Sequence, residues 1–318
     1  MERNYNAIDI VKLLMALFVV AIHVHPEECL DNFNLKDIIR NLYSLAVPFF
    51  FTASGLFLWN KLKNKSRMER LMLLRRWLKR ITRLYILWTI IYLPYTIYGL
   101  ILEDNSVGKS FLIFIRNVLL VGENYLSWPL WYLLAMIVAG CIIYLMLKCK
   151  FTDRYMYYMA LLFILVGFLI ENLHWDAYFS LFKTTRNGLF YGFPYMMIGV
   201  FLSSFSIVIS NYVKIFLLIL GLILQMNEIE IGRFLSIYAI YSIILSSYWD
   251  KWDGVCETFR MTSTVFYFVH MLWVGLFLIF SPTISPFNLF IMVILLCSLT
   301  AYVVIKNKER KIVKLLFR

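Results

Sequence analysis

Long apolar runs follow one another along the whole chain and are separated by short polar segments. A helix needs about 20 mostly apolar residues to cross the hydrocarbon core of a bilayer. Ten segments approach this length and composition: 8–25, 40–60, 82–102, 128–147, 155–173, 187–205, 211–227, 231–248, 262–281 and 286–305. In lipid only helices and closed barrels satisfy every backbone polar group, and a barrel would show short alternating segments instead. The pattern therefore predicts an all-α, polytopic membrane protein with about ten transmembrane helices.

Composition and charge agree with this fold class and add an orientation. Hydrophobic residues make up 62% of the chain and charged residues only 16%, whereas soluble domains average about 45–50% and about 25%. With the N-terminus inside, 23 of the 31 Lys and Arg residues fall in cytoplasmic segments, as the positive-inside rule requires. We expect a multi-pass protein of the plasma membrane with both termini in the cytoplasm. We interpret the net charge of +12 as a sign of how the chain is oriented in the membrane, and not as a sign of nucleic-acid binding.

The chain shows neither internal repeats nor metal-binding spacing. Residues 1–318 are expected to form a single integral membrane domain, because no change of composition divides them. The five cysteines form neither a CxxC pair nor a zinc pattern, so no metal site is predicted. A transporter or flippase is an alternative class, which would usually show inverted repeats and helices broken at matching positions in two halves. Pro94 and Pro194 form no such pair.

Ionisable side chains inside the first apolar segment are the strongest sign of chemistry. Lys12 and His23 are 11 residues apart, which places them on one face of a helix, about 16 Å apart along its axis. Ionisable groups within a span are costly and mark functional sites, so His23 is a candidate proton-handling group. The structural alternative is that Lys12 reaches the inner interface and His23 lies in the outer one. His25, directly before Pro26, is interpreted as an interface residue.

Six short motifs follow in order along nearly the whole chain. They are Lys12 and His23 with ten residues between them, FFFTASGLFL at 49–58, KRITRLY at 79–85, WPLWYL at 128–133, TRNGLF at 185–190 and Val269-His270. Together they resemble the acyltransferase 3 family of membrane O- and N-acyltransferases, although that family often has arginine where Lys12 stands. The segment 185–190 resembles the branch that includes the membrane part of vancomycin-resistance serine racemases.

The resemblance implies an enzyme that moves an acyl group, expected to be acetyl, from cytoplasmic acyl-CoA to an extracytoplasmic hydroxyl. The expected acceptor is a cell-surface glycan, and N- or O-acetylation of a small amino acid is the alternative. A catalytically inactive membrane partner in glycan assembly is a third hypothesis. In the loop 60–83, which holds ten basic residues and one acid, the resemblance implies that Arg80 and Arg83 bind the phosphates of CoA. Part of that loop is amphipathic at helical spacing, and most of it is expected to form an interfacial helix on anionic lipid.

The remaining candidate residues have expected roles in this reaction. His23 would be the general base on the acceptor hydroxyl, and whether an acyl-histidine intermediate forms is left open. Lys12 and Arg186 are candidates for binding the donor and for stabilising the developing oxyanion. Glu171 is the first candidate for a carboxylate that orients His23. Its rivals are Asp176 and Glu123.

Other motif residues have structural alternatives of equal or greater weight. Ser54-Gly55 is expected to permit close helix packing rather than chemistry. The aromatic residues of WPLWYL are interpreted as an outer interfacial belt, with a sugar-stacking wall as the alternative. For His270, a hydrogen-bonded structural role and a functional one are equally open.

Overall fold

The computed structural model describes residues 6–205, 209–247 and 253–318, and all the regular structure in these ranges is helical. The predicted all-α fold class is confirmed. The last residue of the segment predicted at 231–248 lies outside the described residues. The chain divides into two compact units, the first formed by residues 1–50 with 206–317 and the second by 51–205. That residues 1–318 act as a single domain stays a prediction.

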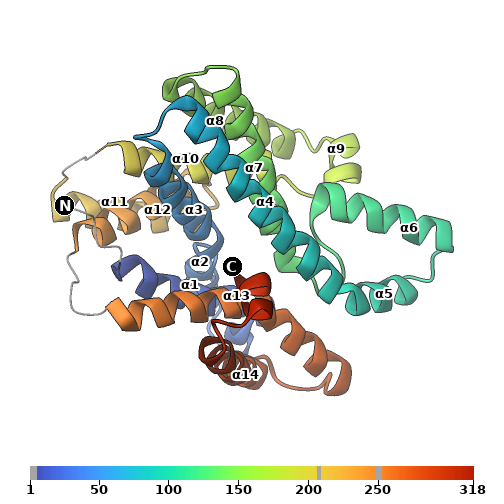
Figure 1. Cartoon of the computed structure of the whole chain (residues 1–318). Coiled ribbons are helices and arrows are strands. Elements are labelled where there is room, and N and C mark those ends of the chain that lie inside the picture. Colours follow the sequence, from blue (N-terminus) through green and yellow to red (C-terminus); the bar gives the residue numbers. More distant parts are fainter. Residues whose placement is uncertain (1–5, 206–208, 248–252) are drawn as a thin grey trace. The chain divides into compact units, whose positions relative to one another are not determined.

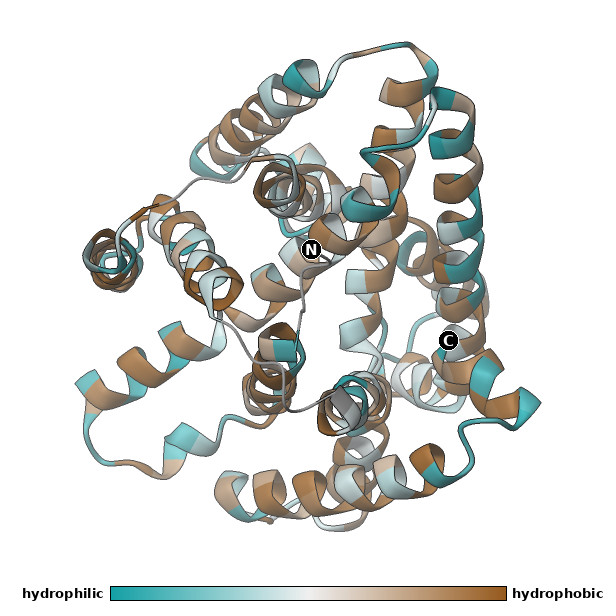
Figure 2. Cartoon of the chain, turned by 60° about the vertical axis from the view of Figure 1, so that its left-hand side comes forward, coloured by the Kyte–Doolittle hydropathy of each residue, from teal (hydrophilic) through white to brown (hydrophobic). Residues whose placement is uncertain are grey.

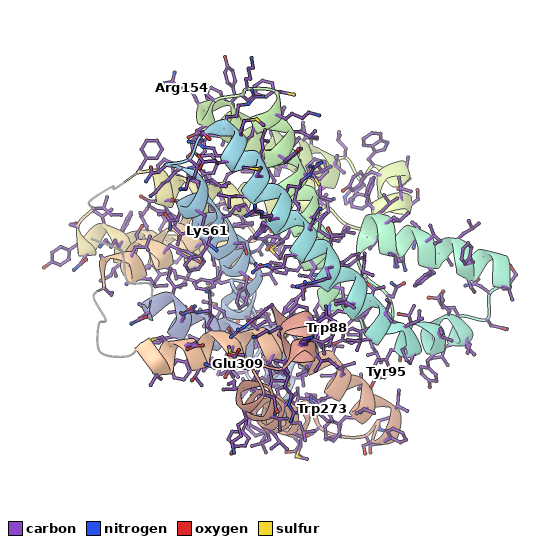
Figure 3. The ribbon with its side chains drawn as sticks, viewed as in Figure 1. Lys61, Trp88, Tyr95, Arg154, Trp273 and Glu309 are labelled. Atoms are coloured by element: carbon purple, nitrogen blue, oxygen red, sulfur yellow. The ribbon has the colours of Figure 1, made fainter. Side chains whose placement is uncertain are left out.

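The first unit combines both ends of the chain. Its α1 packs along α13 and against α14, and α11 pairs with α12 (Figure 1). Trp273 of α13 donates its indole N–H to Thr300 Oγ1 of α14 at 3.3 Å (Figure 3). The elements of this unit are α1 (Asn6–Val24), η1 (Pro26–Cys29), α2 (Phe33–Tyr43), the first residues of α3 (Ala46–Leu62), α11 (Asn211–Met226), α12 (Ile231–Ser246), α13 (Asp253–Phe280), α14 (Pro286–Lys306) and α15 (Lys311–Phe317).

The second unit is a continuous stretch of chain in which α4 packs on α7, and α10 packs on α7 and α8. It contains the rest of α3, α4 (Arg67–Ile91), α5 (Leu93–Leu102), α6 (Val107–Arg116), η2 (Asn117–Val121), η3 (Trp128–Leu130), α7 (Trp131–Lys148), α8 (Asp153–Asn172), α9 (Asp176–Phe182), η4 (Gly188–Gly192) and α10 (Phe193–Ser204).

The predicted apolar segments all fall on helices, but those helices differ in length. Among the described residues, six helical stretches are long and apolar enough to cross a membrane. A seventh span arises if α4 and α5, bent by 54°, count as one. Pro94 in the first turn of α5 explains that break, because proline removes a backbone donor and clashes with the preceding turn. Shorter apolar helices cover the remaining three segments. A count of ten spans and cytoplasmic termini stay predictions.

The surface of the long helices is apolar where a soluble protein would be polar. Hydrophobic residues surround much of the helical surface (Figure 2). On α8, for example, Leu161, Leu165 and Phe168 are all exposed. Continuous exposed apolar surface of this kind indicates contact with lipid, and the chain is therefore a multi-pass membrane protein.

The basic segment 60–83 is largely helical, as its amphipathic spacing predicts, and its helix α4 begins at Arg67. A capping box begins α4: Ser66 Oγ accepts a hydrogen bond from the Glu69 amide, and the Glu69 carboxylate accepts one from the Ser66 amide at 2.9 Å. This pair satisfies two of the amide groups that a helix start leaves without partners. Most of the basic residues therefore lie on one rigid helix that continues into the apolar segment.

Small residues permit a close approach between α3 and α10 in the second unit. A Cβ atom added at Gly55 would lie 2.0 Å from the carbonyl oxygen of Met196, and one added at Gly199 would lie 2.1 Å from that of Thr52. Thr52 Oγ1 donates to the carbonyl of Tyr195 at 3.1 Å across the same contact. The packing interpretation of Ser54-Gly55 is confirmed.

Candidate active site

Two imidazoles lie against each other in the first unit. His23, in the last turn of α1, stacks on His270 of α13 with ring centroids 5.4 Å apart and planes 29° apart. His270 is fully buried, and its Nδ1 lies 2.8 Å from the carbonyl oxygen of Phe266. Because a carbonyl only accepts, Nδ1 must bear the hydrogen, which leaves a lone pair on Nε2. This Nε2 has no hydrogen-bond partner among the described residues.

Lys12 belongs to a charged group at the other end of α1. Its ammonium lies 3.0 Å from Asp9 Oδ1, and Arg260 of α13 donates its Nε–H to Asp9 Oδ2 at 2.9 Å. The Asp9 carboxylate is buried, whereas the Arg260 guanidinium is more than half exposed. The three side chains carry one net positive charge, so Lys12 acts together with Arg260 and not as an isolated cation. Arg260 was missed in the sequence because its helix begins nine residues before the predicted segment 262–281.

The same two contacts fix the direction of α13 relative to α1. Asp9 pairs with Arg260 near the start of each helix, and His23 stacks on His270 further along each. The two helices therefore run in the same direction. If ten spans alternate in direction, the first and the ninth must be parallel, as these two helices are.

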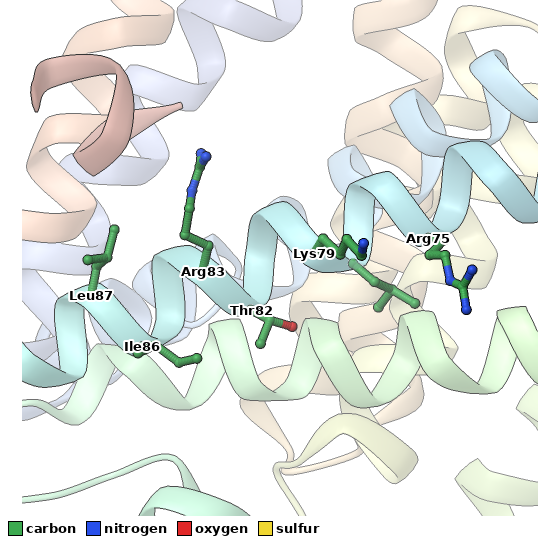
Figure 4. A pocket seen from close by; sticks show the side chains of 7 residues that line it. Arg75, Lys79, Thr82, Arg83, Ile86 and Leu87 are labelled. Carbon is green, nitrogen blue, oxygen red and sulfur yellow. The ribbon is translucent and has the colours of Figure 1, made fainter. Parts of the chain in front are cut away.

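The arginines expected to bind CoA lie on α4, in the second unit. Arg75, Lys79 and Arg83 follow one another at intervals of four and line an open pocket of about 560 Å³ (Figure 4). Residues four apart lie on one face of a helix, so the pocket presents three cations in a row. Arg80 is exposed on the same helix but does not line the pocket. The cationic site thus includes Arg83 from the predicted pair and two basic neighbours, Arg75 and Lys79, which were not among the predicted CoA ligands.

Two of the acidic candidates, Glu171 and Glu123, lie beside the segment 183–186 of the second unit. Thr185 Oγ1 donates to the Glu171 carboxylate at 3.3 Å. Burial raises the pKa of Glu123, while the charges of Lys183 and Arg186 lower it by a smaller amount. Arg186 and Glu123 therefore lie close enough to interact. Glu171, expected to orient His23, has its described hydrogen bond within its own unit.

The motif at 185–190 has a structural explanation. Asn187 Oδ1 accepts hydrogen bonds from the amides of Leu189 and Phe190, at 2.9 and 3.2 Å, and so begins η4. A Cβ atom added at Gly188 would lie 2.8 Å from the carbonyl oxygen of Ala135 in α7. Asn187 and Gly188 therefore shape the turn before α10. This turn also fixes the backbone position of the preceding residue, Arg186.

The motifs at 49–58 and 128–133 pack against each other. Ser54 Oγ and Tyr132 Oη lie 3.1 Å apart, and the ring of Phe51 lies 4.5 Å from that of Tyr132. Trp131 also contacts Phe51 and, at 6.0 Å, Tyr191. These aromatic residues are core contacts of the second unit rather than a belt that only faces the interface.

The sequence candidates thus fall into two groups. Lys12 and His23 lie on α1 of the first unit, about 16 Å apart along one helix. The candidates of the second unit are Arg80, Arg83, Glu123, Glu171, Asp176 and Arg186. His270 becomes a stronger candidate than the sequence indicated, because only the fold brings it to His23.

The comparisons with known proteins show the family of the chain. The model of the acyltransferase 3 family, described as an acyltransferase domain, matches residues 5–305. The match covers nearly the whole chain and both units, and the chain therefore belongs to the acyltransferase 3 family of membrane acyltransferases. The resemblance inferred from the six motifs is confirmed.

Several curated relatives have racemase names. Two proteins of Enterococcus faecalis, each named amino-acid racemase, are 26% identical over 266 residues and 25% identical over 214 residues; these cover 78% and 63% of this chain and 35% and 29% of the relatives. A serine/alanine racemase of Enterococcus gallinarum is 28% identical over 207 residues, covering 61% of this chain and 28% of that protein. The chain spans about a third of the length of these relatives. No solved structure matches it.

Proposed function

We propose that this protein transfers an acetyl group from cytoplasmic acetyl-CoA to an extracytoplasmic hydroxyl, with His23 as general base. The observation that supports this most is the stacked pair of His23 and His270 within a chain of the acyltransferase 3 family. A neutral imidazole has a lone pair on one ring nitrogen and can accept the proton of a hydroxyl.

In the proposed reaction the acceptor hydroxyl donates a hydrogen bond to His23 and attacks the carbonyl carbon of the thioester. His23 takes the hydroxyl proton as the new C–O bond forms, the C–S bond breaks and the CoA thiolate leaves. His270, whose Nδ1 is fixed by the Phe266 carbonyl, holds the His23 ring by stacking and is a positioning residue. No metal enters this scheme.

The donor site is proposed on α4. The phosphates of CoA carry several negative charges, and charge-assisted hydrogen bonds from guanidinium groups are the strongest way to hold them. Arg83 lines the pocket with Arg75 and Lys79, which supports Arg83 more directly than Arg80. Arg80, the other arginine of the predicted pair, lies on the same helix and is a second proposed CoA ligand. Lys12 and Arg260 form a separate cation group on the first unit, for which we also propose a role in binding the donor.

A cell-surface glycan is the proposed acceptor. We place the protein in the plasma membrane, with both of its termini in the cytoplasm. A hydroxyl- or amine-bearing amino acid is the second candidate, because three relatives are named for racemases of amino acids. Arg186 and Glu171 would then belong to the acceptor side, since both lie in one neighbourhood of the second unit with Thr185.

The test is acyl transfer by the purified protein. Radiolabelled acetyl-CoA is incubated with surface polysaccharide fragments and, separately, with serine and alanine, and labelled products are separated by chromatography. We expect transfer by the wild type and by His174→Gln, whose exposed histidine lies outside the candidate site, and none by His23→Gln. Transfer by His23→Gln at the wild-type rate would contradict the role of His23, and label in serine alone would select the second acceptor.

The donor site has a separate test. Titration calorimetry with CoA should show at least tenfold weaker binding for Arg83→Gln, since each charge-assisted hydrogen bond contributes about 1.5–3 kcal/mol. Arg76→Gln, a basic residue on the same helix that does not line the pocket, is the matched control. Equal CoA affinity in both variants would refute the proposed donor site.

A further inference from the structure

A second histidine lies at the end of α1, and its backbone is strained. His25 follows the last residue of α1 and adopts φ 56° and ψ 53°, in the left-handed region. Residues with a Cβ rarely adopt this conformation, and glycine is the usual choice at such a helix end. Strained residues cluster at functional sites, where the surrounding structure holds them in place. A histidine at a position that favours glycine therefore indicates that its imidazole has a role there.

A buried carboxylate fixes the ring of His25. Glu27 Oε1 lies 3.2 Å from His25 Nδ1 and accepts a hydrogen bond from Arg40 Nε at 3.0 Å. The Glu27 side chain is 0% exposed, whereas that of His25 is 58% exposed. Since a carboxylate oxygen accepts hydrogen bonds, Nδ1 of the neutral ring bears the hydrogen and Nε2 presents a lone pair. A carboxylate that orients an imidazole in this way is the arrangement of a general base.

Charged side chains surround the carboxylate that binds His25. Glu28 binds both Arg40 and Lys36, the latter at 3.2 Å, and Asp37 lies 3.7 Å from Arg40. The three carboxylates of this group, including Glu27, face two basic side chains. One net negative charge is therefore left beside the His25 ring.

We propose that His25, oriented by Glu27, takes the acceptor proton over from His23 and releases it to the extracytoplasmic water. This inference rests on the proposed acyl transfer. The O–H bond of the acceptor breaks as the ester C–O bond forms and the thioester C–S bond breaks. The proton leaves through His23 and His25, and the thiolate of CoA takes a proton from cytoplasmic water. His25 is thus a relay residue, and Glu27 and Arg40 are positioning residues.

The alternative is that the pair of His25 and Glu27 only ties η1 to α1. The two roles differ in what a glutamine at position 25 does, because it can still donate a hydrogen bond to Glu27 but cannot take up a proton. A structural tie would survive in His25→Gln, whereas a relay would not. The exposed position also means that small molecules can reach the space left by His25→Ala.

The test measures acetyl transfer by His25→Gln and His25→Ala with and without added imidazole. The control is His174→Gln, since His174 is also exposed and left-handed, with φ 44°. We expect both His25 variants to lose at least tenfold in kcat with an unchanged KM for acetyl-CoA. Imidazole should restore His25→Ala severalfold and leave the wild type and the control unchanged.

Each outcome decides the matter. Full activity of His25→Gln, or a slow His25→Ala that imidazole does not restore, overturns the relay while the acyl transfer stands. Absence of transfer by the wild type to any acceptor overturns both together. If His25→Gln fails to fold, as judged by size-exclusion chromatography, His25→Asn replaces it, because asparagine tolerates the left-handed backbone.

Discussion

The charged group of Asp9, Lys12 and Arg260 makes an asymmetric prediction about stability. Asp9 is 4% exposed and serves two cations, of which Lys12 is 14% exposed and Arg260 56% exposed. Asp9→Asn leaves the nearly buried ammonium of Lys12 without its carboxylate. Breaking a buried ion pair by removing one partner costs about 3–5 kcal/mol, and we take the lower end because Lys12 is not fully buried.

Lys12→Met should be milder. Asp9 keeps the hydrogen bond from Arg260 at 2.9 Å, so the substitution removes one of the two charge-assisted hydrogen bonds to Asp9, which costs about 1.5 kcal/mol. The two variants should therefore differ by about 1.5 kcal/mol, or roughly tenfold in the unfolding equilibrium. The double variant should regain part of the stability lost in Asp9→Asn, since it no longer holds a nearly buried ammonium that has lost its carboxylate.

Equilibrium unfolding in mixed detergent micelles, followed by tryptophan fluorescence, measures these differences. A free energy of unfolding for Lys12→Met that is as low as that of Asp9→Asn would refute the reasoning. Because Lys12→Met is expected to fold, its acyl-transfer rate also decides whether Lys12 takes part in chemistry. An unchanged rate would restrict Lys12 to the structural pair.

Three further predictions concern packing, pH and a buried hydrogen-bond group. Gly55→Leu should destabilise the second unit by about 3 kcal/mol or abolish folding, because even a Cβ would lie 2.0 Å from the Met196 carbonyl oxygen. Thermal unfolding measures this loss, and an unchanged unfolding midpoint would contradict the prediction. Burial raises the pKa of Glu123, so ionisation of this carboxyl costs stability as pH rises. The stability of Glu123→Gln relative to the wild type should therefore increase between pH 4 and 8 in thermal scans. A decrease over this range would refute the predicted direction of the pH effect. Gln225→Leu removes a donor to the Asn41 carbonyl at 2.6 Å and should cost about 1–3 kcal/mol, which denaturant titration measures; a gain in stability would show that the leucine compensates for that bond.

Much of the fold follows from the apolar pattern. The ten predicted segments all coincide with helices, because an apolar run in lipid has only the helix to satisfy its backbone. What the pattern did not reveal are the helix starts. The capping box of Ser66 and Glu69 and the early start of α13 at Asp253 depend on polar residues outside the apolar runs. For the same reason Arg260 was placed in a loop although it lies on a helix.

The candidate site was predictable only where its residues share one helix. Lys12 and His23 follow from helical spacing alone, and Arg80 and Arg83 from their resemblance to a family motif. The contact between His23 and His270 joins residues 247 positions apart in the chain, and no periodicity indicates such a contact. The pair of His25 and Glu27 was overlooked because its meaning depends on a left-handed backbone, which the sequence suggests only where glycine or asparagine stands.

The central claim is that an imidazole on α1 acts as general base while an acyl group passes from a donor on one side of the membrane to an acceptor on the other. It is tested most directly in sealed proteoliposomes, with radiolabelled acetyl-CoA outside and the acceptor found in solution trapped inside. Protein inserted with its cytoplasmic side outward should label the trapped acceptor, and His23→Gln should not, although it binds CoA as the wild type does. Label that stays outside the vesicles, or equal labelling by His23→Gln, would contradict the account.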